Sequence, residues 1–113
     1  MSQETIIAKT YDLLKFSLPS LAKFPRNHKF TLGDRIQTML GELLELTIEA
    51  YYAPKSRKKE LLHRINILLE KLRYYFRLCF DLALYPSTRY GEFAKRLDEI
   101  GRMCGGWLKS LDN

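Results

Sequence analysis

The chain has 113 residues, 46% of them hydrophobic and 28% charged, with a formal net charge of +6; it should form one domain (residues 1–113) whose remaining apolar surface an oligomer can cover. Cys79 and Cys104 are too few for a disulfide framework, so both are expected to be buried thiols. The start MSQETIIAKT is unlike a signal peptide, and no segment approaches the ~18 uncharged apolar residues of a membrane span, so we expect a cytoplasmic protein without a membrane partner.

The first predicted element is a helix from about Gln3 to Lys23, in a chain whose lack of strand-like turn signals predicts an all-α fold. Its buried side is expected to comprise Ile6, Ile7, Leu13, Leu14, Leu18 and Leu21. Pro19 removes an amide donor and should cause a kink or a late break. The following segment FPRNHKF should be an ordered loop anchored by Phe24 and Phe30, because Pro25 disfavours helical geometry at Phe24.

A second helix is predicted from Leu32 to about Tyr52. Thr31 is its expected N-cap, with Asp34 three positions on as the acid of a capping box. The expected buried stripe comprises Ile36, Met39, Leu40, Leu43, Leu44, Leu46, Thr47, Ile48 and Ala50.

A third helix is predicted after the break at Pro54, with Ser56 as its cap. Its broad core stripe comprises Leu61, Leu62, Ile65, Leu68, Leu69, Leu72, Tyr75, Phe76, Cys79, Phe80 and Ala83. Ile67, Tyr74 and Leu78 fall on the opposite side of the same helix. Because a four-helix monomer supplies only one core, we infer a subunit interface at these three residues. Scattered surface apolar residues are the alternative.

The segment YPSTRY is predicted to end the third helix and to start a fourth helix, which is capped by Ser87 or Thr88. Its apolar positions keep helical spacing and comprise Tyr90, Phe93, Leu97, Ile100, Cys104, Trp107 and Leu111. Since the last two keep phase across Gly105 and Gly106, the helix is expected to continue through the glycine pair. Because the two glycines have no side chains, another element should be able to approach closely and bury Trp107. Gly105, Gly106 and Trp107 are therefore assigned to the oligomer interface.

Positive charge is concentrated in residues 55–77, where the only acids are Glu60 and Glu70. Arg73 and Arg77 form a ridge beside the apolar strip, and paired guanidinium groups suit phosphates or an acidic protein surface. We therefore expect a polyanion partner, bound without sequence readout; a solvated helix face is the alternative. The candidate binding residues are Lys23, Arg26, Lys29, Lys59, Arg64, Arg73 and Arg77.

No catalytic constellation is recognisable. His28 and His63 lack the spacing of metal ligands on a helix, and glycine-rich phosphate loops are absent. Glu42, Glu45 and Glu49 share one helix face, which is normally solvated; a di-metal carboxylate site is the alternative. We expect no enzymatic activity and no cofactor.

Three segments resemble the accessory variability determinant (Avd) proteins of diversity-generating retroelements: FPRNHKFTLGDRI, LRYYFRLCFDL and EIGRMCGGWLK. The resemblance implies an up-down four-helix bundle, assembled as a homopentameric barrel with a positively charged surface, in a bacterial or phage-encoded protein. It also implies a non-enzymatic accessory protein that binds the reverse transcriptase and the template RNA or its cDNA during error-prone cDNA synthesis. The paired arginines of the family's third helix correspond to Arg73 and Arg77.

Two other functions remain open from the sequence. Proteins encoded by intervening sequences in 23S ribosomal RNA genes are similar in fold and lack a reverse-transcriptase partner. A structural oligomer that serves as an interaction module without a nucleic-acid role is the second alternative. Cys104 also stands where a larger aliphatic residue is expected, so the packing around Trp107 should be loosened.

Overall fold

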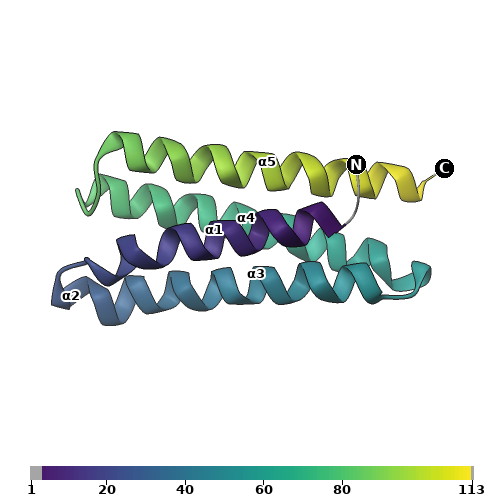
Figure 1. Ribbon diagram of the computed structural model, residues 1–113, viewed down its shortest axis with the longest axis horizontal. Helices are drawn as coiled ribbons and strands as arrows, with labels where there is room; N and C mark the ends of the chain where they lie inside the picture. The colour runs from purple at the N-terminus through teal and green to yellow at the C-terminus, as the bar shows by residue number, and fades with distance from the viewer. Residues whose placement is uncertain (1–3, 113) are drawn as a thin grey trace.

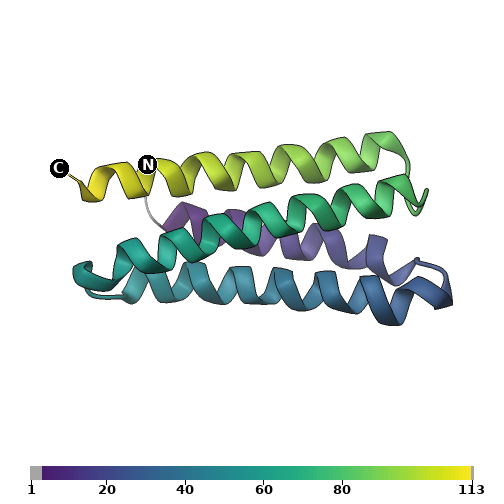
Figure 2. The ribbon, with the colours of Figure 1, turned by 180° about the vertical axis from the view of Figure 1, so that it is seen from behind.

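The computed structural model describes residues 4–112, and every regular element in that range is helical. Figure 1 shows the four long helices side by side, with neighbours antiparallel, in an up-down bundle of 47 × 23 × 19 Å. In chain order they are α1 (Glu4–Ala22), α3 (Asp34–Tyr52), α4 (Lys55–Asp81) and α5 (Ser87–Leu111). Helix α1 packs against α3 and α5, and α4 packs against the same two helices, so α1 and α4 occupy opposite corners (Figure 2). Within the described range, none of the helices has the length and apolar character needed to cross a membrane.

Helix α1 differs from its prediction on one face. The predicted start at Gln3 lies outside the described residues, and the helix ends at Ala22, shortly after Pro19, in agreement with a late break. The burial predicted for Leu18 is wrong, because its side chain is 37% exposed. Thr10 and Ser17 are buried instead. Their hydroxyls donate to main-chain carbonyls four residues earlier, at 2.8 and 2.6 Å, so neither is left without a partner.

The loop predicted for FPRNHKF is wrong over residues 26–30, which are helical, whereas Phe24 and Pro25 are not. A single turn, α2 (Arg26–His28), passes into a π-helical turn, η1 (Lys29–Gly33), which runs directly into α3. Phe24 is buried as predicted, whereas Phe30 is 61% exposed and anchors nothing. The capping role predicted for Thr31 is also wrong: its hydroxyl lies within η1 and donates to the carbonyls of Asn27 and His28 at 3.3 Å.

A proline occupies the N-cap position of three helices. Pro25, Pro54 and Pro86 precede α2, α4 and α5, and no side chain caps any of these helices. The carbonyls of Pro54 and Pro86 accept the first main-chain hydrogen bonds of α4 and α5. Proline fixes φ near the value of an extended N-cap residue but has no side-chain acceptor, so these helix starts lack a hydroxyl cap. The caps predicted at Ser56 and at Ser87 or Thr88 are therefore wrong.

Helix α4 ends in a left-handed C-terminal turn. Ala83 has φ of 59°, its N–H donates to the Phe80 carbonyl, and the N–H of Leu84 donates to the Cys79 carbonyl. This pair of bonds defines a Schellman motif, which usually places glycine at the left-handed position. The core position predicted for Ala83 is wrong, because the helix ends at Asp81 and leaves Ala83 exposed.

The core follows the predicted stripes of the second, third and fourth helices, with few exceptions. Besides Ala83, the exposed exception is Ile48, whose side chain is 38% exposed. Aromatic rings fill the end of the bundle near α2, where Phe76 stacks on Phe93 with centroids 4.4 Å apart and the Tyr85 hydroxyl donates to the Phe76 carbonyl. At the other end Trp107 is 6% exposed, so the loosened packing expected beside Cys104 does not leave the ring open to solvent.

Candidate functional site

An apolar strip lies on the outer face of α4, away from the bundle core. Ile67, Tyr74 and Leu78 are 60%, 65% and 42% exposed, which confirms that they lie outside the core of their own chain. Leu82, just beyond the end of the helix, is 44% exposed. Apolar side chains that are grouped on a monomer surface commonly mark an interaction site, so a subunit interface at the strip stays a prediction.

The arginine ridge beside this strip is held by carboxylates. The Arg73 guanidinium contacts Glu70 at 2.8 Å and Asp98 on α5 at 3.4 Å. Arg77 lies 3.8 Å from Asp81. The positive charge of the ridge is therefore partly compensated within the chain, although exposed ion pairs contribute at most about 1 kcal/mol and can be exchanged for a phosphate.

Two further lysines of the basic segment also have partners. Lys59 lies 3.5 Å from Asp112. The Lys58 ammonium donates to the carbonyls of Ala50 and Tyr51 at 2.8 Å and lies 5.4 Å from the centroid of the Trp107 ring. Lys58 thus stabilises the C-terminal end of α3, where the main-chain carbonyls concentrate negative charge, and its role is structural.

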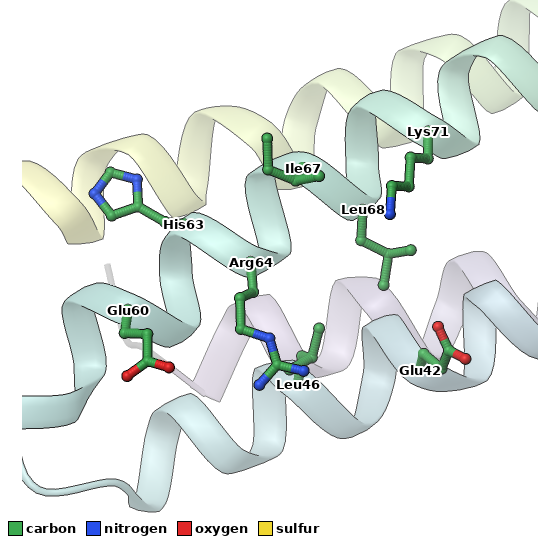
Figure 3. A pocket seen from close by; sticks show the side chains of 8 residues that line it. All are labelled: Glu42, Leu46, Glu60, His63, Arg64, Ile67, Leu68 and Lys71. Atoms are coloured by element: carbon green, nitrogen blue, oxygen red, sulfur yellow. The ribbon is translucent and has the colours of Figure 1, made fainter.

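A shallow groove of about 490 Å³ lies between α4 and α3, on the side of the apolar strip opposite to the arginine ridge. Its lining residues are Glu42, Leu46, Glu60, His63, Arg64, Ile67, Leu68 and Lys71. Figure 3 shows Arg64 extending from α4 toward Leu46 on α3, with Lys71 and Glu42 at one end of the groove and Glu60 at the other. Arg64 and Lys71 form no ion pair within the described residues. Lys71 was not predicted as a site residue, although it lies one helical turn from Ile67 and seven residues after Arg64.

Three of the predicted binding residues, Lys23, Arg26 and Lys29, lie at a corner of the bundle where α1 ends and α3 begins. Lys23, Arg26 and Lys29 make no ion pair with any carboxylate in the described part of the chain. The Lys29 ammonium lies 5.7 Å from the centroid of the exposed Phe30 ring. We call Lys23, Arg26, Lys29 and Phe30 the basic corner. It lies at the end of the bundle where α4 also ends (Figure 1).

A third set of cations lies on the outer face of α5 and was not predicted. Lys95, Arg102 and Lys109 are exposed, recur every seven residues and form no ion pair in residues 4–112. The acids of this helix are turned to its sides; Glu99, for example, lies 2.9 Å from Lys9 on α1. The hydrogen bond from Lys9 lowers the pKa of the Glu99 carboxyl, so this acid stays ionised and bound to its partner. The seven-residue spacing was the available sequence signal.

The glycine pair lies inside α5, so the predicted continuation of the helix is confirmed. The predicted close approach is wrong within this chain, because a Cβ atom at Gly105 or Gly106 would meet nothing within 4 Å. Trp107 packs into the core of its own bundle and offers little surface to a neighbour. A role of the two glycines in contacts between copies stays a prediction.

No reactive centre emerges from the described residues. They contain no group of three histidine, cysteine, aspartate or glutamate side chains placed to hold a metal ion. Cys79 and Cys104 are free and buried, as predicted. Burial raises the pKa of each thiol to about 11, so both stay protonated and unreactive near neutral pH. The chain thus offers surfaces for binding, with the unpaired cations as their most distinct chemical feature.

Comparison with known proteins supports one of the two family resemblances. The sequence matches the bAvd-like family over residues 5–111, which is nearly the whole chain. This family is not a known family of enzymes. No curated protein matches the sequence.

Proposed function

The chain belongs to the bAvd-like family, and we propose from this premise that it is a non-enzymatic accessory protein of a diversity-generating retroelement. In this role it binds the reverse transcriptase together with the template RNA or its cDNA, and it supports mutagenic reverse transcription. The family match carries this proposal. The unpaired cations of the basic corner and of the groove support the nucleic-acid part of it.

The basic corner and the groove are the nucleic-acid surfaces in this proposal. Lys23, Arg26 and Arg64 are exposed and Lys29 is partly exposed, and none of the four forms an ion pair within the described chain, so binding a phosphate breaks no ion pair. Cations of this kind bind the nucleic-acid backbone regardless of sequence and release counterions as they do so. The affinity for RNA should therefore fall steeply as salt is raised.

The arginine ridge is the proposed surface for the reverse transcriptase. Arg73 contacts Glu70 and Asp98, and Arg77 lies 3.8 Å from Asp81; planar guanidinium groups can exchange such exposed ion pairs for directional contacts with an acidic protein surface. Capture of the chain by the cognate reverse transcriptase should drop on double substitution Arg73→Ala, Arg77→Ala. Arg102→Ala, which removes an exposed charge from α5, is the matched control. Undiminished capture of the double variant would remove the ridge from the proposal.

Assembly into a homo-oligomer, with a pentamer as the state implied by the family resemblance, is part of the same proposal. The exposed strip of Ile67, Tyr74 and Leu78 and the open surface at Gly105 and Gly106 support it. Light scattering should return a multiple of the chain mass. The mass of a single chain at working concentration would overturn it.

The compensated ridge favours one other function, that of an oligomeric interaction module without a nucleic-acid role. Arg73, Arg77 and Lys59 all lie within ion-pair distance of carboxylates, as expected of a surface that only solvates a helix. A salt titration of RNA binding separates the two functions. Absence of binding even at low salt would favour the interaction module.

A further inference from the structure

Phe30 has a place unlike that of any other phenylalanine in the chain. The other five are buried or partly buried, whereas Phe30 is 61% exposed. It lies in the π-helical turn η1 between α2 and α3. Such turns are rare, and they occur frequently at functional sites. An exposed phenylalanine ring does not contribute the stabilisation that burial provides. A role in binding would explain its exposed position.

The surroundings of the ring are cationic and polar. Residues 16–33 contain no aspartate or glutamate. Within this acid-free segment, Lys23, Arg26 and Lys29 carry no ion pair to the described carboxylates, and the Lys29 ammonium lies 5.7 Å from the ring centroid. The Phe30 ring thus lies beside the Lys29 ammonium, in a segment whose charges are all positive until Asp34.

We propose that the basic corner binds single-stranded nucleic acid, with one unpaired base stacked on Phe30 and the flanking phosphates contacted by Lys23, Arg26 and Lys29. This inference rests on the proposed nucleic-acid role and assigns that role a site. Proteins that bind single strands combine an aromatic ring for the base with cations for the backbone, and both parts are present here.

A protein partner fits this corner less well. Anchors at protein interfaces usually lie at the centre of a well-packed patch, whereas the residues next to Phe30 in the chain, from Asn27 to Thr31, are polar or charged. A base needs only the face of one ring, and its phosphates complement the three cations. A double-stranded segment presents no free base face to Phe30, so the proposed ligand is single-stranded.

The test compares two labelled probes by fluorescence anisotropy: a short oligouridine, and an abasic oligomer with the same number of phosphates. Phe30→Ala should weaken binding of oligouridine about 10-fold and leave the abasic oligomer unchanged, because only the stacked base is lost. Phe30→Tyr keeps the ring and should bind as the original chain does. Arg26→Ala should weaken binding of both probes and reduce the slope of log affinity against log salt by about 0.7.

Tyr11→Ala is the control for loss of an exposed ring, because Tyr11 is 53% exposed in the middle of α1, away from the corner. Unchanged oligouridine binding by Phe30→Ala would overturn the stacking role and leave the proposed function standing. Equal weakening of both probes by Phe30→Ala would also overturn the stacking role. The same holds if the Phe30→Ala variant loses capture by the reverse transcriptase while its binding of oligouridine stays intact. If the original chain binds neither probe at low salt, this inference and the nucleic-acid part of the proposed function both fail.

Discussion

Replacing Gly105 and Gly106 by alanine should stabilise the isolated chain. Both positions lie inside α5, and a Cβ atom at either would meet nothing within 4 Å. Glycine in a helix interior is about 1 kcal/mol less favourable than alanine. The double substitution should therefore raise the free energy of unfolding by about 2 kcal/mol, since no neighbouring atom has to move.

The same positions should respond in the opposite direction when assembly is measured. If another copy packs on the glycine pair, Gly105→Leu fills the space that this copy needs, and the assembled mass should fall. Unfolding is followed by circular dichroism in urea at a dilution where the chains are separate, and mass by light scattering at working concentration. Gly91→Ala is the matched control, because its Cβ atom also meets open space on α5; it should add about 1 kcal/mol and leave the mass unchanged.

Two results would refute this reasoning at different points. A double alanine variant no more stable than the original chain would show that the surface of the isolated chain is not open at Gly105 and Gly106. A stabilised double variant, together with an unchanged assembled mass for Gly105→Leu, would show that the glycine pair is open but lies outside every contact between copies.

Further predictions concern stability. Ala83→Gly should raise the unfolding free energy by about 0.5 to 1 kcal/mol in urea titrations, because φ of 59° strains alanine by more than glycine's added flexibility costs; a loss would contradict it. Gly101→Ala places a Cβ atom 3.0 Å from Nη2 of Arg73, so this guanidinium has to shift by a few tenths of an ångström, and its exposed ion pair with Asp98 is weak enough to allow that shift. The free energy of unfolding should rise by up to about 1 kcal/mol, and a destabilised variant would refute this. The folded pKa of Cys79 and Cys104 is about 11 against 9.0 ordinarily, so the folded chain keeps protons that the unfolded chain releases. The free energy of unfolding should therefore fall by about 2 kcal/mol per thiol between pH 9 and pH 11. It should fall less in the Cys104→Ala variant, and identical pH profiles of the variant and the original chain would contradict this.

The core was predictable because helical periodicity alone determines which residues share a face. The positions from Phe93 to Trp107 in the last helix keep gaps of three and four residues, and Phe93, Leu97, Ile100, Cys104 and Trp107 are all buried. Leu18 shows the limit of this rule. It lies at the edge of its stripe, and whether an edge position is covered depends on how closely the neighbouring helix approaches.

The helix starts were not predictable from hydroxyl residues. Each of Thr31, Ser56 and Ser87 stands near a helix start and is a favoured capping residue type. In the two cases of Ser56 and Ser87, a proline just upstream already provides the extended geometry of the N-cap. In the case of Thr31 the helix had begun earlier, through the π-helical turn, whose hydrogen-bond pattern has no simple sequence signature.

The candidate site was predictable as a set of exposed cations but not as a pattern of free and paired ones. A helical wheel places Arg73 beside the strip, yet it cannot show that Asp98, from another helix, lies 3.4 Å away. Ion pairs between helices depend on their relative height and rotation, which the sequence does not state. For the same reason Lys71 and Lys95 emerged as unpaired cations only from the fold.

We propose that this chain is an accessory protein that supports reverse transcription of a retroelement's template. The most direct test is cDNA synthesis by the cognate reverse transcriptase on the retroelement's template RNA, with and without the purified chain. The yield of template-dependent cDNA should rise when the chain is present, and the Arg73→Ala, Arg77→Ala variant should raise it less. Equal cDNA yield and equal error frequency in the absence of the chain would contradict it.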